Sequence, residues 1–231
     1  MKKLLVTFGD SWTYGSELDK PSEQNWTSTV GKYLLAETLN LGCPASSIGH
    51  LAVQLFQYVD QVEKYKEYKK IFMIGLTGTT RHLSYSNTLK EFINITPEAN
   101  YRTNNIHTSG RPPEIVKELD KLSIEMYKVV ECVEYNKYIL KQTMMLFQNY
   151  CEINSIDTIF FSYFDYLPMN DFKINYYPES LTKTLTGNEY TLPDIRENQY
   201  FSGKLFHPNE LGHIKIAELL HEFYTKVYPG N

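Results

Sequence analysis

The sequence has few cysteines, no long hydrophobic run and no excess of positive charge, and each shortage excludes a class of protein. An odd number of cysteines at wide spacings, Cys43, Cys132 and Cys151, predicts neither a disulfide framework nor a metal site. No apolar run approaches the roughly 18 residues of a membrane-spanning helix. The net charge of -4 argues against nucleic acid as a partner, because such proteins usually carry a basic patch. We therefore expect a protein of the reducing cytoplasm that binds neither membranes nor nucleic acids.

The chain does contain apolar segments that alternate between strand-like and helix-like patterns. Short runs typical of buried strands occur at residues 3–8, near residue 40, at 71–76 and at 157–162. Helical periodicity is found at residues 26–39, 48–68, 113–151 and 208–223. This alternation favours an α/β protein whose parallel sheet is covered on both faces. No linker or repeat interrupts the pattern, so residues 1–231 are expected to form a single domain.

Two long stretches, at about 78–113 and 163–203, lack clear periodicity and are expected to be loop insertions at the catalytic edge of the sheet. The helical pattern from Ile115 to Cys151 would measure about 54 Å at 1.5 Å per residue, which exceeds the width of such a domain. We favour a break near residues 134–138. The alternative is a helix that projects from the body, which would favour contact with a second copy, so a homo-oligomer stays open.

Two short polar motifs lie at opposite ends of the chain. Asp10 and Ser11 directly follow the first strand, and His207 directly precedes the last helix. Catalytic and ligand-binding groups of open α/β sheets gather at the carboxyl ends of the strands. Ser11 is therefore a candidate nucleophile and His207 a candidate base. The alternative is an ordinary turn in which Ser11 or Asp10 caps the next helix.

These motifs carry a resemblance to a known family. Phe8-Gly9-Asp10-Ser11, followed near the C-terminus by His207-Pro208-Asn209-Glu210-Leu211-Gly212-His213, resembles the SGNH (GDSL) hydrolases over the whole chain. The resemblance implies a flavodoxin-like, three-layer α/β/α domain with a parallel sheet of about five strands. It also implies ester hydrolysis through an acyl-enzyme on Ser11, with His207 as general base and with no metal or cofactor.

By the same resemblance, Ser11, Ala45 and Thr77 would form the oxyanion hole. Ala45 fits the spacing of the family's glycine better than Gly42 does, and its backbone N–H would serve as well. Thr77 stands where the family has asparagine, and its hydroxyl is a shorter donor. Because one lost oxyanion donor costs about 2.7 to 4 kcal/mol, this departure is expected to slow the chemistry.

A larger departure concerns the acid that orients the histidine. The family usually has an aspartate three residues before the histidine, where this chain has Lys204. Either a Ser–His dyad operates, or another group takes the place of the aspartate. Asp165, just past the fourth strand, is the candidate acid, and Asp194 is a second one.

The sequence thus predicts an esterase for a short acyl ester, with an acetyl group on a carbohydrate as the favoured substrate. Arg81 is a candidate contact for an anionic or sugar group. Asp10 is expected to fix the turn through local hydrogen bonds, with substrate contact as its other role. The competing hypothesis is a binding or structural protein on the same scaffold, because Lys204 and Thr77 replace catalytic side chains. Acyl transfer to an acceptor other than water would use the same residues.

Overall fold

The computed structural model describes residues 1–78, 81–86, 91–95, 121, 133–164, 172–187, 198–202 and 207–230. Its centre is a parallel sheet with the strand order β2-β1-β3-β6-β7. The strands are β1 (Lys3–Phe8), β2 (Ala36–Asn40), β3 (Lys69–Leu76), β6 (Asp157–Ser162) and β7 (Tyr176–Ser180). In chain order this is 2-1-3-4-5, the order of flavodoxin-like sheets. The predicted fold class is confirmed.

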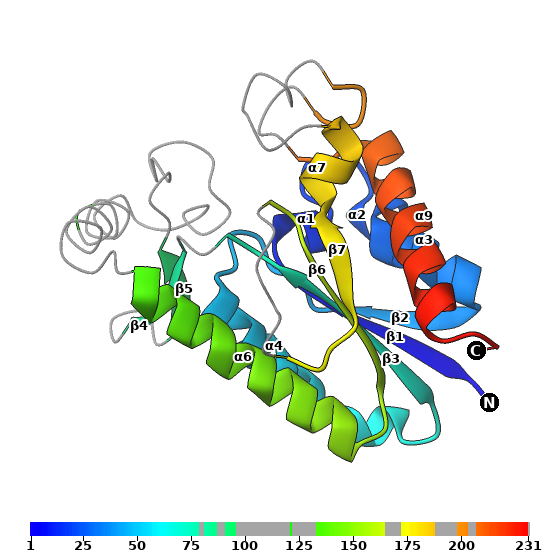
Figure 1. Cartoon of the computed structure of the whole chain (residues 1–231), viewed down its shortest axis with the longest axis horizontal. Helices are drawn as coiled ribbons and strands as arrows, with labels where there is room; N and C mark the ends of the chain where they lie inside the picture. The colour runs from blue at the N-terminus through cyan, green and yellow to red at the C-terminus, as the bar shows by residue number, and fades with distance from the viewer. Residues whose placement is uncertain are drawn as a thin grey trace.

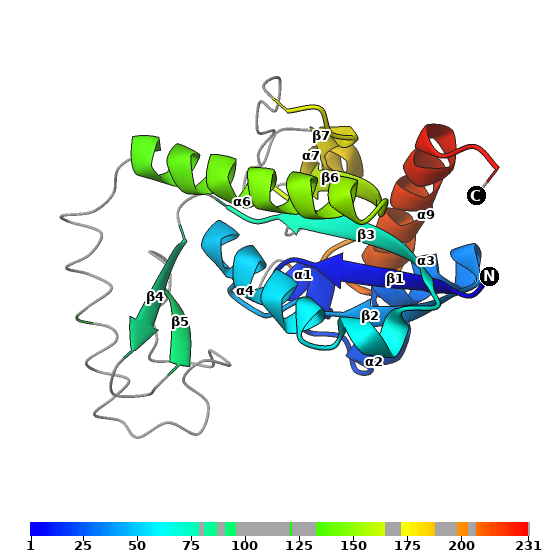
Figure 2. The same cartoon turned by 90° about the horizontal axis from the view of Figure 1, so that it is seen from below.

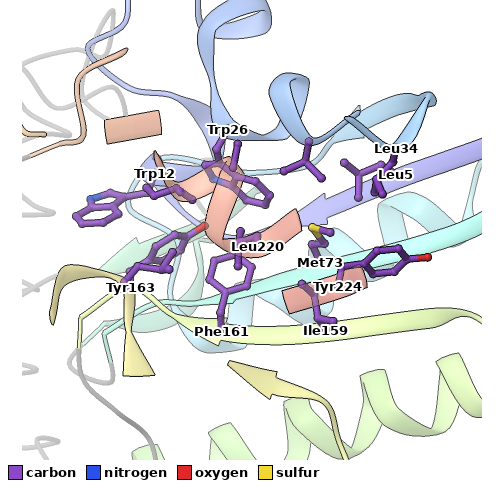
Figure 3. Packing of buried hydrophobic residues seen from close by; sticks show 14 of the residues in the cluster. Leu5, Trp12, Trp26, Leu34, Met73, Ile159, Phe161, Tyr163, Leu220 and Tyr224 are labelled. Atoms are coloured by element: carbon purple, nitrogen blue, oxygen red, sulfur yellow. The ribbon is translucent and has the colours of Figure 1, made fainter. Parts of the chain in front are cut away.

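Helices cover both faces of the sheet and give three layers (Figures 1 and 2). One face is covered by α4 (Ile48–Val59) and α6 (Val133–Ile153), and the other by α3 (Trp26–Leu34) and α9 (Glu210–Val227). Successive residues of β1 alternate between the layers, since Leu4 packs against the α4 side and Leu5 against the α9 side. Figure 3 shows the core on the α9 side, with Trp26, Phe161 and Leu220 packed together.

Side-chain caps fix where the three principal helices with described starts begin. Asn25 accepts a hydrogen bond from the Ser28 N–H before α3, and Asn209 accepts one from the Gly212 N–H before α9. Ser47 does the same for α4. Such caps satisfy backbone donors that have no partner within the helix, and each contributes about 1 kcal/mol. The last helix therefore starts at Glu210, three residues after His207.

Several predicted helix boundaries are wrong. The first predicted helix ends at Leu34, because Leu35 adopts a left-handed conformation (φ 51°) and β2 follows at once. The second is α4 followed by a separate 3-10 turn, η1 (Val62–Tyr65). The break predicted near 134–138 is also wrong, since α6 is continuous from Val133 to Ile153. This segment contains no proline or glycine, the usual causes of a kink.

The two stretches predicted as long loops contain regular structure where they are described. The first holds an antiparallel pair, β4 (His82–Ser86) and β5 (Glu91–Ile95). The second holds β7 and the helix α7 (Leu181–Thr186). Pro178 interrupts the strand pattern of β7 in the sequence, so this strand was not predicted. Because β7 is an edge strand, it tolerates the proline. The rest of both stretches lies outside the described residues. In the described part of the chain, no helix combines the length and apolar character needed to cross a bilayer.

Candidate active site

The candidate site lies at the carboxyl ends of β1 and β3. At this point the strand order reverses, because β2 lies on one side of β1 and the later strands lie on the other. The helix that follows β1 lies on one face, and α6, which precedes β6, lies on the other. Ligand sites of open α/β sheets form at such switch points. Asp10 and Ser11 directly follow β1, and Thr77 directly follows β3. The topology therefore brings three of the sequence-predicted residues to one place.

Asp10 is the centre of a hydrogen-bond network at this edge. Its side chain is fully buried, and its Oδ1 accepts from the Trp12 N–H at 3.0 Å. That bond caps the short helix α1 (Ser11–Tyr14), as expected for a residue that fixes the turn. Oδ2 accepts from the Thr77 hydroxyl at 2.9 Å and from Arg81 Nη1 at 3.0 Å. Asp10 thus links the end of β1 to the end of β3.

The Thr77 hydroxyl is fully engaged by its two charged neighbours. It donates its single proton to Asp10 and accepts from Arg81 Nη1 at 2.9 Å. In this arrangement it has no hydrogen left for an oxyanion, so the predicted oxyanion role requires the hydroxyl to rotate away from Asp10. That role stays a prediction. Arg81 Nη1 also lies 3.3 Å from the Ser46 carbonyl oxygen, so it reaches the loop after β2.

A glutamine that no sequence motif marked holds in place the loop that carries the candidate nucleophile, residues 9–11, which we call the nucleophile loop. Gln54 is fully buried on α4; its Oε1 accepts from the Gly9 N–H at 2.9 Å, and its Nε2 donates to the Gly9 carbonyl at 2.8 Å. Gly9 has a φ of 155°, and a Cβ there would collide with the Thr13 side chain. The signal in the sequence was a polar residue on the apolar face of a helix, between Leu51 and Leu55.

The loop after β2 lies against the same turn. The Cys43 N–H donates to the Gly9 carbonyl at 3.1 Å, which fixes this loop beside the end of β1. Two residues on, Ala45 has a φ of 60°, the left-handed region that favours glycine. The family pattern has glycine at this position, so the backbone conformation agrees with the alignment of Ala45. Its role as an oxyanion donor stays a prediction.

Packing between the two ends of the chain brings His207 to the nucleophile loop. The Trp12 ring lies 5.5 Å from the Phe201 ring, centroid to centroid, and Phe201 forms a β-bridge with Pro208. Ser11 directly precedes Trp12 in the sequence, and His207 directly precedes Pro208. Each therefore neighbours a residue that takes part in this packing. The Ser202 N–H also donates to the His207 carbonyl at 2.8 Å. These bonds fix the backbone of the histidine against residues 200–202.

Gly212 lets the last helix approach that segment closely. A Cβ at this position would collide with the Tyr200 carbonyl oxygen, which accepts from the Asn209 N–H at 3.0 Å. Farther along α9, the buried His213 accepts from the Trp26 N–H at 3.2 Å through Nδ1. These contacts set the start of α9, and with it the position of His207.

The electrostatics place His207 among the charges of the same site. Burial lowers the pKa of His207 below its ordinary value, while the negative charges of Glu17 and Asp10 oppose this shift and Arg81 adds to it. The imidazole is therefore neutral at pH 7, as a general base must be. Asp10 and Arg81 act on it from the ends of β1 and β3, so His207 and the loop that carries Ser11 share one electrostatic environment.

Among the described residues, the carboxylate nearest to the histidine is one that the sequence did not predict. Glu17 Oε2 lies 3.3 Å from His207 Nδ1, and the Ser202 hydroxyl donates to the same Glu17 oxygen. Glu17 belongs to the turn after α1, so only the tertiary structure brings it to position 207. The predicted candidates Asp165 and Asp194, and also Lys204, lie outside the described residues.

Comparisons with known proteins find structural similarities of low level and no sequence match. No family model and no curated protein sequence matches the chain significantly. Among solved structures, TesA is similar with a TM-score of 0.48 and 11% identity over 97% of this chain and 99% of that one. AlinE4, an SGNH-hydrolase family esterase, has a TM-score of 0.41 and 12% identity over 100% and 98%. A two-domain esterase active on acetylated mannans has a TM-score of 0.45 and 13% identity over 98% of this chain and 50% of that one. Similarity at this level carries no conclusion about activity.

Proposed function

We propose that this protein is a serine esterase that hydrolyses a short-chain acyl ester through an acyl-enzyme on Ser11, with His207 as the base. One observation carries the proposal: segments from opposite ends of the chain meet at the carboxyl edge of the sheet. Trp12 packs on Phe201, and Glu17 contacts His207. A nucleophile, a neutral base and backbone donors are the parts that acyl transfer needs.

The reaction follows from these roles. His207 takes the Ser11 hydroxyl proton as the oxygen attacks the ester carbonyl and a C–O bond forms. His207 then returns that proton to the leaving alcohol as the ester C–O bond breaks, which leaves the acyl group on Ser11. Water attacks the acyl-enzyme and gives a proton to His207. The imidazole passes this proton to the Ser11 oxygen as the carboxylic acid leaves.

The negative oxygen of the intermediate requires donors. We assign the backbone N–H groups of Ser11 and Ala45 to this task. Thr77 is the third candidate, but its hydroxyl can donate to the oxyanion only after it rotates away from Asp10, to which it now donates while accepting from Arg81. The Arg81 guanidinium, with a side chain 20% exposed, adds a positive charge close to the same edge and suits a carbonyl oxygen or an anionic substituent of the substrate.

A short acyl group on a polar alcohol suits the described part of the site. Asp10, Thr77 and Arg81 make this edge of the sheet polar, and the partly exposed Arg81 favours an acetyl ester of a carbohydrate over a long acyl chain. The rates with p-nitrophenyl acetate and p-nitrophenyl octanoate, and acetate release from an acetylated oligosaccharide, test this choice. Faster turnover of the octanoate would contradict it. The cytoplasmic location and the absence of nucleic acid or membrane partners stay predictions.

The test of the function itself is nucleophile substitution. We expect Ser11→Ala to lose p-nitrophenyl acetate hydrolysis and labelling by a fluorophosphonate probe. Ser22→Ala, an exposed serine on the helix α2 (Pro21–Gln24), serves as the matched control and should keep both. Equal rates for Ser11→Ala and the parent protein would refute the proposal.

The engaged hydroxyl of Thr77 favours a second candidate, a protein that binds an ester or a sugar without cleaving it. If the Asp10–Thr77–Arg81 network never opens, the third oxyanion donor is missing. This candidate predicts no fluorophosphonate labelling of Ser11 and ligand binding that Ser11→Ala leaves unchanged. Acyl transfer uses the same residues as hydrolysis, and product analysis with candidate alcohol acceptors separates the two.

A further inference from the structure

The histidine of the proposed catalytic pair has a carboxylate beside it. We propose that Glu17 positions His207, in the task that the family resemblance gives to an aspartate three residues before the histidine. The inference rests on the proposed esterase function and names the group that orients its base. The side chain at that earlier position, Lys204, has only donors, so it cannot accept the ring proton of a histidine.

Among the described residues, the group that lies beside His207 Nδ1 and can accept its proton is the Glu17 carboxylate. Within the described residues, this buried atom has no hydrogen bond of good geometry. Glu17 Oε2 is 3.3 Å away, and the side chains of His207 and Glu17 are only 16% and 15% exposed. A buried N–H without an acceptor is costly, so the carboxylate stabilises a proton on Nδ1. Catalytic hydrogen bonds are often long without substrate and shorten in the reacting complex.

The proton on Nδ1 decides which nitrogen acts as the base. With Nδ1 protonated toward Glu17, the neutral ring keeps its lone pair on Nε2, on the other side of the imidazole. Nε2 then accepts the Ser11 proton, and Glu17 stabilises the imidazolium that forms without taking a proton itself. Without Glu17, the two tautomers compete and the ring loses its fixed orientation.

The backbone of Glu17 is held in a conformation that a glutamate rarely adopts. Its φ is 70°, in the left-handed region, where a Cβ crowds the following carbonyl oxygen. The Ser202 hydroxyl donates to its carboxylate, and the neighbouring Ser16 N–H donates to the Ser11 carbonyl at 2.9 Å. Strain of this kind persists where the surroundings impose it and is concentrated at functional sites. The turn therefore places the carboxylate within reach of the histidine at a local cost.

The charged groups that act on His207 come from three segments: Glu17 follows α1, Asp10 follows β1 and Arg81 follows β3. On α9, burial and the neighbouring His207 lower the pKa of His213 to about 3, so His213 is neutral in the pH range of the test. Glu17 and Asp10 favour the imidazolium, and Arg81 opposes it. Loss of the Glu17 charge is therefore expected to move the His207 titration to lower pH, and the pH midpoint of kcat/KM with it.

The experiment compares Glu17→Gln and Glu17→Gly with the parent protein. Glycine accepts the left-handed conformation, so Glu17→Gly should be at least as stable as the parent. Both variants should lose kcat at least tenfold with KM changed by less than about threefold, because orientation acts in the transition state. Glu17→Asp keeps a carboxylate and should recover part of kcat. Glu23→Gln, an exposed glutamate paired with Lys20 at 3.6 Å, is the matched control and should behave as the parent.

A readout apart from activity separates this inference from the proposed function. The imidazole resonances of His207, followed by NMR against pH, should titrate at lower pH in Glu17→Gln than in the parent and in Glu23→Gln. An unchanged titration, or full kcat in Glu17→Gln, overturns the positioning role while the Ser11→Ala result stands. Hydrolysis that survives Ser11→Ala overturns the esterase function, and the titration still decides whether Glu17 acts on His207.

Discussion

The two halves of the candidate site are built differently. On the nucleophile side, which carries Ser11, the buried Asp10 accepts hydrogen bonds from Trp12, Thr77 and Arg81. Gln54 hydrogen-bonds both the N–H and the carbonyl of Gly9 and so clamps this residue. In the described part of the chain, the base side is held by the contact of 3.3 Å between Glu17 and His207, by the Ser202 hydrogen bond to Glu17, and by the backbone pairing of residues 200–202 with 207–209. In the proposed mechanism both groups need a fixed geometry, which the network supplies to Ser11 and which the carboxylate of Glu17 would supply to His207.

If this comparison is right, the most damaging change lies on the nucleophile side. Asp10→Ala leaves Arg81 and Thr77 without the carboxylate that accepts from both, and it should lower the free energy of unfolding by about 3 kcal/mol. This is the low end of the range for a buried ion pair, because Arg81 is partly exposed. Urea denaturation measures the loss. Asp19→Ala, an exposed aspartate in the neighbouring turn, should cost less than about 0.5 kcal/mol. Similar values for the two variants would contradict the network.

Gln54→Leu tests the clamp on Gly9. The change leaves the buried Gly9 N–H without its acceptor, while the Gly9 carbonyl keeps its hydrogen bond from the Cys43 N–H, so we expect a loss of about 2 kcal/mol and slower hydrolysis. Gln57→Leu, on the exposed side of the same helix, is the control. If Gln54→Leu is as stable and active as Gln57→Leu, the nucleophile loop does not depend on the clamp.

The base side should respond to acid. Burial lowers the pKa of His213 from 6.5 to about 3, so between these values the unfolded chain binds a proton that the folded protein rejects. Stability therefore falls as pH decreases from 6.5 toward 3. His213→Gln removes this titration, and its loss of stability between pH 7 and pH 4.5 should be smaller than the parent's by on the order of 2 kcal/mol. Equal losses, measured by urea denaturation at both pH values, would contradict the assignment.

The smallest expected effect concerns the loop after β2. Ala45→Gly removes a Cβ from a left-handed residue, and the gain of about 1–2 kcal/mol is partly offset by the greater freedom of glycine when unfolded. We expect stability to rise by about 0.5 kcal/mol and the hydrolysis rate to stay within about twofold, because the backbone N–H is kept. Thermal unfolding and p-nitrophenyl acetate kinetics measure both, and a strongly impaired variant would show that the Ala45 methyl group matters.

The sequence predicted what is encoded in short segments. The strand before Gly9, the strand before Thr77 and the helix after His207 each carry a local pattern of apolar residues, and the topology of parallel strands then places their ends together. Asp10 as a turn-fixing residue followed from its position before a helix. These predictions needed no knowledge of contacts between distant residues.

The features that the sequence did not reveal depend on tertiary contacts. Glu17 is nine positions beyond Phe8, the last residue of β1, and nothing local pairs it with position 207. Its left-handed φ is typical of glycine or asparagine, so the sequence gives no turn signal there. The strand β7 escaped notice because its pattern is interrupted by Pro178, and it forms because β6 offers a free edge. Both depend on residues far apart in the chain.

That last strand also bears on how the protein behaves at high concentration. In the described sheet, β2 and β7 are the outer strands, and exposed backbone at such edges can recruit strands of other chains. The β7 edge carries the exposed Pro178 and Glu179 and an irregular register with β6, while β2 presents the exposed Glu37. Proline, charge and irregular pairing all hinder strand addition. The open sheet is thus protected at both margins against growth into aggregates, and any self-association is expected to use its helices.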